Sequence, residues 1–168
     1  TVHSAKYSHC AFTGKALRFP KMMARYGWEV VEYSNAGSES EAFEKVAIFT
    51  ESEFRGYFGE RSDTDFYGND AVIGSPAHQE FERRLISEMA ARVQARDIIC
   101  HPFGDAHETL LRVFPNNHHV ETGIGYPTLM EGSFKVFESY AWMHYHQGKA
   151  GRNGHSYEWV VPNYFDIE

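Results

Sequence analysis

The stretch Asp97-Ile-Ile-Cys-His-Pro-Phe-Gly-Asp105 decides the fold class of this chain. Its first half is a compact apolar run typical of a buried β-strand, and its second half is polar and contains a glycine. We expect a strand at 97–101, followed by a short helix that residues 105–108 cap and Pro115 closes. A strand that passes directly into a helix is the elementary unit of an α/β fold.

The segments on the N-terminal side continue this alternation of helices and strands. We predict helices at 8–27, from 50 to about 59 and from 75 to about 93, strands at 28–33 and 45–50, and a loop at 60–74. Thr50 and Glu53 form a capping box, and Ser75 followed by Pro76 is a typical helix start. Pro20 should kink or restart the first helix, because it has no backbone N–H to donate.

The segments on the C-terminal side follow the same pattern. We predict strands at 118–122, 134–137 and 157–161, with a helix from Ser139 to about His146 before the last of them. Short apolar strands that alternate with helices favour a mostly parallel sheet with helices on both faces. We therefore predict a Rossmann-like α/β fold in which residues 1–168 form a single domain.

The composition limits the classes of function. The chain has 168 residues, and its formal net charge of −7 disfavours a broad contact with nucleic acid, which needs an excess of Lys and Arg. Cys10 and Cys100 lack the spacing of a metal site or a disulfide framework, so we expect a reduced, cytoplasmic setting. No apolar run reaches the roughly 18 residues of a membrane-spanning helix, so we expect no membrane span.

Polar residues at the carboxyl ends of three predicted strands form the candidate site, since open α/β sheets bind ligands there. At the first strand end, His101 and Asp105 flank a glycine that allows a ligand to approach the backbone. The start of the following helix favours an anion or a hydroxyl group. The alternative is structural, with Asp105 capping the helix and His101 satisfying the turn.

The second strand end carries Glu121-Thr-Gly-Ile-Gly125. It lacks the third glycine and the immediate helix of a dinucleotide-binding loop. We expect Glu121, Thr122, Gly123 and Gly125 to contact an acceptor or a reacting sugar. The alternative for the glycines is a plain tight turn.

The third strand end is the junction at Glu138 and Ser139. A carboxylate at a strand end can orient a hydroxyl group or act as a base, so Glu138 is a candidate for substrate binding. Ser139 is a candidate for the same site, and its alternative role is to cap the following helix.

The ten histidines do not form a recognisable metal site. His118 and His119 should point to opposite faces of a strand, and His144 and His146 do not face each other on a helix. We therefore expect no metal, and a His-rich, metal-dependent hydrolase is the least favoured alternative. A serine hydrolase is not indicated either, because the chain lacks a Gly-x-Ser-x-Gly motif.

Several separated blocks, in this order, resemble bacterial and phage glycosyltransferases of the two-domain GT-B type. The blocks are YSHCAFT at 7–13, RFPKMM at 18–23, GWEVVEY at 27–33, ETGIGYP at 121–127, FESYAWMHY at 137–145 and VVPNYFD at 160–166. They span nearly the whole chain, and the agreement lies in their order rather than in any single block.

The resemblance implies that this chain is the N-terminal, acceptor-side half of such an enzyme. The donor, a nucleoside diphosphate sugar, would bind mainly to a C-terminal domain that is absent from these 168 residues, so we expect the isolated chain to be inactive. The family pattern also places an apolar strand before residue 7, and residues 1–6 are too short and polar to supply it. We therefore expect the donor-binding domain or another copy of the chain to complete the fold.

The function implied is transfer of a sugar to a hydroxyl acceptor. Residues expected to position the acceptor are His9, Thr13, His101 and Asp105. Glu121, Thr122 and the turn at 123–125 would lie beside the reacting sugar. If the reaction inverts the configuration at the anomeric carbon of the sugar, His101 or Glu121 is the expected base. In a reaction that retains this configuration, the two residues only orient groups. The main alternative is a binding or interaction module with a Rossmann-like shape and no chemistry.

Overall fold

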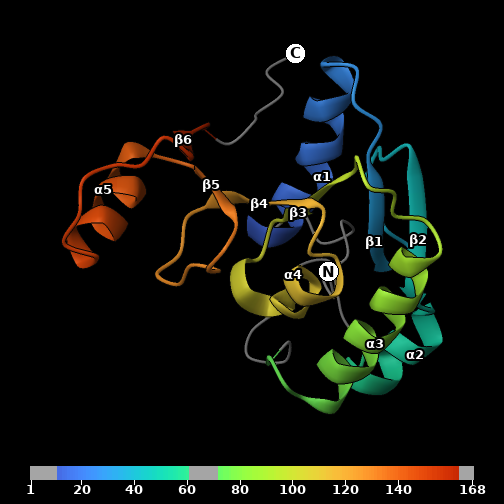
Figure 1. Ribbon diagram of the computed structural model, residues 1–168. Helices are drawn as coiled ribbons and strands as arrows, with labels where there is room; N and C mark the ends of the chain where they lie inside the picture. The colour runs from blue at the N-terminus through green and yellow to red at the C-terminus, as the bar shows by residue number, and fades with distance from the viewer. Residues whose placement is uncertain (1–10, 61–71, 163–168) are drawn as a thin grey trace. The chain divides into compact units, whose positions relative to one another are not determined.

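The protein is a mixed α/β structure, shown in Figure 1 as a computed structural model that describes residues 11–60 and 72–162. Every strand pairing in the described residues is parallel, and the strands form one sheet of two strands and one of four. The predicted α/β class with parallel strands is confirmed. The described residues divide into two compact units, one up to Arg92 and one that begins at Val93.

The first unit contains the two-stranded sheet and three helices. Its elements are α1 (Ala11–Arg25), β1 (Val31–Asn35), β2 (Glu44–Phe49), α2 (Glu51–Phe58) and α3 (Pro76–Ala90). The predicted starts of α2 and α3 depend on side chains close in sequence, and these two starts are confirmed. Thr50 and Glu53 form the capping box of α2, and the Ser75 side chain accepts a hydrogen bond from the backbone N–H of His78. Pro20 lies inside α1, which is not restarted there.

Aromatic side chains form the core of the first unit. Phe49 at the end of β2 and Phe81 on α3 are fully buried, and their rings meet edge to face with centroids 5.5 Å apart. Tyr57 on α2 stacks on Phe49 from another direction at 5.2 Å. In Figure 1, α2 and α3 accordingly lie against β2. These contacts explain why apolar residues recur on one face of α3.

The second unit contains the four-stranded sheet. Its elements are β3 (Ile98–His101), the 3-10 helix η2 (Gly104–His107), α4 (Thr109–Val113), β4 (His118–Ile124), β5 (Phe134–Phe137), α5 (Tyr140–Lys149) and β6 (Glu158–Val160). The strand order is β3-β4-β5-β6, so each strand pairs with the next in sequence. The helix α5 packs against β5 and β6 (Figure 1), and the fully buried Ile124, Met130 and Phe137 belong to the core.

Each sheet contains one parallel connection that has no helix. Residues 36–43 lead from β1 to β2, and residues 125–133 lead from β4 to β5. Parallel strands are usually connected through a helix, so these loops need other contacts to become ordered. In the first, Glu32 of β1 accepts hydrogen bonds from the hydroxyls of Ser38 (2.8 Å) and Ser40.

Among the helices of the described residues, none combines the length and the apolar character required to cross a membrane.

Candidate functional site

The carboxyl ends of β3, β4 and β5 lie at the same edge of the four-stranded sheet, because the strands are parallel. His101 is the last residue of β3 and pairs in register with Glu121 of β4. Ile124 at the end of β4 pairs with Phe137 at the end of β5, and Glu138 follows directly. The structure therefore brings the three strand ends singled out in the sequence to one edge of one sheet.

Glu121 is fully buried, and hydrogen-bond donors from the β4–β5 connection surround it. Its carboxylate accepts from the Tyr126 hydroxyl at 3.0 Å and from the Met130 backbone N–H at 3.1 Å, and it pairs with the Lys135 ammonium at 3.2 Å. Burial, together with the negative charge of Glu121, raises the pKa of the Tyr126 hydroxyl well above its usual range. Both oxygens of Glu121 are thus engaged within the protein, and they order residues 125–133.

His101 is also buried, with 4 % of its surface exposed. Its Nε2 lies 2.9 Å from Nδ1 of His119, and Nε2 of His119 lies 2.9 Å from the carbonyl oxygen of Phe114. Burial is the main cause that lowers the pKa of His101 to about 3, and His119, His107 and Lys135 add to it. His101 is therefore uncharged at neutral pH and can accept a hydrogen bond.

Backbone irregularities mark the same edge of the sheet. The pairing of β4 with β5 shifts register between Glu121 and Ile124, and Gly123 has φ of 65° within this segment. Such bulges bend a strand and redirect its end. Gly123 lies inside β4 and not in a turn after it, which corrects the prediction of a turn at 123–125.

Gly125 allows a carboxylate to approach the backbone at the end of β4. A Cβ atom at this position would lie 2.1 Å from Oε1 of Glu138, so the Glu138 side chain occupies the space next to Gly125. Gly104 plays a similar part beside β3, since a Cβ there would lie 2.9 Å from the ring of Tyr126. Thr122, between these features, is half-buried.

Four further residues were predicted for the site. His9 lies outside the described residues. Thr13 is in α1 of the first unit and is fully buried. Ser139 caps α5 by accepting a hydrogen bond from the Trp142 backbone N–H at 3.3 Å, which is the structural role considered for it. Asp105 is half-buried in η2.

The expectation that residues 105–108 cap the next helix is wrong. The residue before η2 is Phe103 and the residue before α4 is Glu108, and neither makes a side-chain capping hydrogen bond. The chain already turns at Gly104, so Asp105 lies inside the short helix and cannot cap it.

Comparison of the chain with protein-family models, with curated proteins and with solved structures finds no match.

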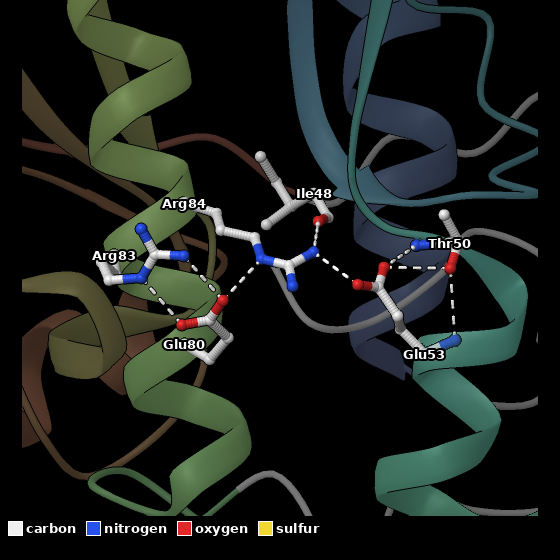
Figure 2. A network of polar contacts seen from close by, with 6 residues as sticks. All are labelled: Ile48, Thr50, Glu53, Glu80, Arg83 and Arg84. Carbon is white, nitrogen blue, oxygen red and sulfur yellow. Dashed lines mark hydrogen bonds and ion pairs between the residues drawn. The ribbon is translucent and has the colours of Figure 1, made fainter.

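A polar network in the first unit, drawn in Figure 2, was not predicted from the sequence. Arg84 of α3 donates to Glu80 on its own helix, at 2.7 Å, and across to Glu53 of α2, at 2.8 Å, and to the carbonyl oxygen of Ile48, at 3.3 Å. Hydrogen bonds from Arg83 and Arg84 lower the pKa of Glu80 to about 2. The sequence did contain one signal for this network. Glu80 precedes Arg83 by three residues and Arg84 by four, which are the spacings at which side chains meet on a helix.

A cavity of about 280 Å³ adjoins this network. It is lined by Ala47, Ile48, Thr50, Glu53, Arg83, Arg84, Ser87 and Glu88. The carboxylates of Glu53 and Glu80 already accept hydrogen bonds within the network (Figure 2), and the opposite charges around the cavity largely balance. The network therefore has a clear structural role, which is to hold α3 against the end of β2 and the start of α2.

Proposed function

We propose that this chain is the acceptor-side half of a glycosyltransferase that moves a sugar from a nucleoside diphosphate sugar to a hydroxyl group. The observation that supports it best is the common edge of β3, β4 and β5, which holds His101, Gly125 and Glu138. Ligands of parallel α/β sheets bind at such edges. The donor would bind to another domain, or to another copy of the chain, on the far side of the acceptor.

In this proposal, the hydroxyl group that will receive the sugar donates a hydrogen bond to His101. Its pKa of about 3 makes it a weak base at neutral pH, since effective general bases have pKa values near the working pH. This favours orientation of the hydroxyl over complete removal of its proton, as expected for a retaining transfer. Glu138 would orient a second hydroxyl, and the backbone at Thr122–Gly125 would lie beside the reacting sugar. Glu121 would not contact the sugar. It would hold residues 125–133 in place next to the site through its hydrogen bonds with Tyr126 and Met130.

We also propose that the protein works in the cytoplasm. Cys100 is a free thiol, and free thiols persist in reducing compartments. Burial raises its pKa to about 11, so the thiol stays protonated at neutral pH.

A sugar titration tests the proposal directly. We expect methyl glycosides and disaccharides, added to the ¹⁵N-labelled full chain, to shift the backbone amide signals of Gly104, Thr122, Gly123 and Gly125. His101→Ala should weaken that binding about tenfold, because a hydrogen bond to the sugar is lost. His118→Ala is the matched control, since His118 is exposed on the same sheet. A panel of sugars that leaves these amides unchanged would contradict the proposal.

The second candidate function is that of a non-catalytic binding module. The observation that favours it is that Glu121 and His101 are both buried and bonded to other protein groups. Calorimetric titration with UDP-glucose and GDP-mannose, followed by an assay for release of the nucleotide, separates the two functions. Sugar binding that is unaffected by His101→Ala, together with no nucleotide release by the chain in any oligomeric state, would favour the module.

A further inference from the structure

A chain of hydrogen bonds connects His101 to the backbone through a second histidine. Nε2 of His101 and Nδ1 of His119 are 2.9 Å apart, and Nε2 of His119 is 2.9 Å from the carbonyl oxygen of Phe114. The two rings are nearly parallel, with centroids 5.2 Å apart and an angle of 27° between their planes. Both residues are largely buried, with exposed fractions of 4 % for His101 and 6 % for His119.

The direction of these bonds follows from the carbonyl group, which can only accept. Nε2 of His119 must therefore carry a proton and donate it to Phe114. A neutral His119 then has a bare Nδ1, which accepts the hydrogen bond from His101. His101 consequently carries its proton on Nε2, and its Nδ1 is the basic nitrogen.

We propose that His119 is a positioning residue that holds the ring of His101 in place and fixes its proton on Nε2, so that Nδ1 faces its ligand as an acceptor. The part of this proposal that concerns a ligand rests on the proposed function, whereas the assignment of the protons does not. If an acceptor hydroxyl shares its proton with Nδ1, the bond from Nε2 to His119 offsets the positive charge that develops on the ring. No other group has to gain or lose a proton in that step.

The sheet explains why His119, and not its neighbour, has this role. Side chains alternate between the faces of a strand, so His119 and Glu121 share one face of β4 while His118 lies on the other. His118 is exposed and contacts the ring of Phe134, with centroids 5.7 Å apart. The predicted opposite orientation of the two histidines is confirmed, and only one of them can reach the end of β3.

The bond can be tested by NMR on the ¹⁵N-labelled full chain at pH 7. We expect a scalar coupling between Nε2 of His101 and Nδ1 of His119, with the shared proton attached to His101 and slow to exchange with water. His119→Asn supplies an oxygen acceptor close to the position of Nδ1 and should keep that proton protected. His119→Leu removes the acceptor and should speed its exchange by about tenfold or more, the equivalent of one lost hydrogen bond. His118→Leu is the matched control and should leave exchange unchanged.

The outcomes separate this proposal from the proposed function. A proton found on Nδ1 of His119, or equal exchange in the Asn and Leu variants, would overturn the positioning role whatever the sugar titration shows. The assigned coupling in the unmodified chain supports it even if His119→Leu does not fold. Failure of every sugar to bind, with the coupling present, would overturn the proposed function and the ligand-facing role but not the proton assignment.

Discussion

At the scale of single residues, the buried imidazole of His101 connects stability to pH. Its pKa is about 3 in the folded protein, against an ordinary value of 6.5. As the pH falls below 6.5, the unfolded chain binds a proton that the folded chain does not bind until pH 3, so folding becomes less favourable across that interval. The stabilisation is complete above pH 6.5 and is lost as the pH falls toward 3.

We therefore predict that His101 alone accounts for a loss of about 2 kcal/mol in the free energy of unfolding between pH 7 and pH 5. Urea denaturation at the two pH values measures it. His101→Gln should reduce the pH dependence by that amount, whereas His144→Gln, which replaces an exposed histidine of α5, should not. An equal pH dependence in both variants would show that His101 titrates normally in the folded state.

Gly125 and Glu138 provide a second prediction at this scale. In Gly125→Ala the new methyl group would collide with the Glu138 carboxylate, and the variant should lose about 1–2 kcal/mol of stability. The loss should largely disappear when Glu138→Ala is also present, because the collision is then removed. Gly148→Ala in α5 is the control, since nothing lies within 4 Å of a Cβ there. Additive effects of Gly125→Ala and Glu138→Ala in thermal denaturation would refute the contact.

At the scale of helices and strands, Arg84 is expected to matter more than its neighbour Arg83. Within the described part of the chain, Arg83 bonds only Glu80 of its own helix, whereas Arg84 also reaches α2 and the end of β2 (Figure 2). We predict that Arg84→Gln lowers the Tm by a few degrees and that Arg83→Gln leaves it nearly unchanged, because exposed pairs within one helix contribute little. Equal Tm values for the two variants would mean that the contacts of Arg84 with other elements are not stabilising.

The elements also show which information a sequence carries locally. The helix starts at Thr50, Ser75 and Ser139 were predictable, because each cap bonds a backbone group only three residues away. The alternation of strands and helices likewise indicated parallel pairing. The end of β4 was less predictable. Glycine is typical of turns, but Gly123 lies in a bulge that depends on the pairing of β4 with β5.

Contacts between distant residues could not be derived in this way. His101 and His119 are 18 positions apart, and nothing in their spacing indicates that their rings share a hydrogen bond. Glu121 was predictable as a residue at a strand end but not as a buried carboxylate with three partners, because Tyr126, Met130 and Lys135 meet it only when the connection folds back. The division of the strands into two sheets depends on the same kind of contact.

At the scale of the whole molecule, a glutamate organises the helix-free parallel connection of each sheet. Glu32 accepts from two serines after β1, and Glu121 accepts from a tyrosine and a backbone amide after β4. In both cases one carboxylate satisfies polar groups of a loop that would otherwise be costly to bring close to the sheet. The burial of the two groups differs, since Glu121 is fully buried and Glu32 is half-buried.

This difference predicts local effects that hydrogen exchange can measure. Glu121→Gln removes the charge opposite the half-buried Lys135 ammonium, which should cost about 3 kcal/mol and speed exchange of amides in 118–137 by about 100-fold. Glu32→Gln should have a smaller effect, confined to 31–49, because Glu32 belongs to the other compact unit, which we expect to open separately. Glu131→Gln is the control, because Glu131 is exposed and lies in the connection from β4 to β5. It should leave the exchange rates of both regions unchanged. If Glu121→Gln speeds amide exchange equally in both regions, the two units unfold together. Glu121 would then stabilise the whole molecule rather than its own sheet.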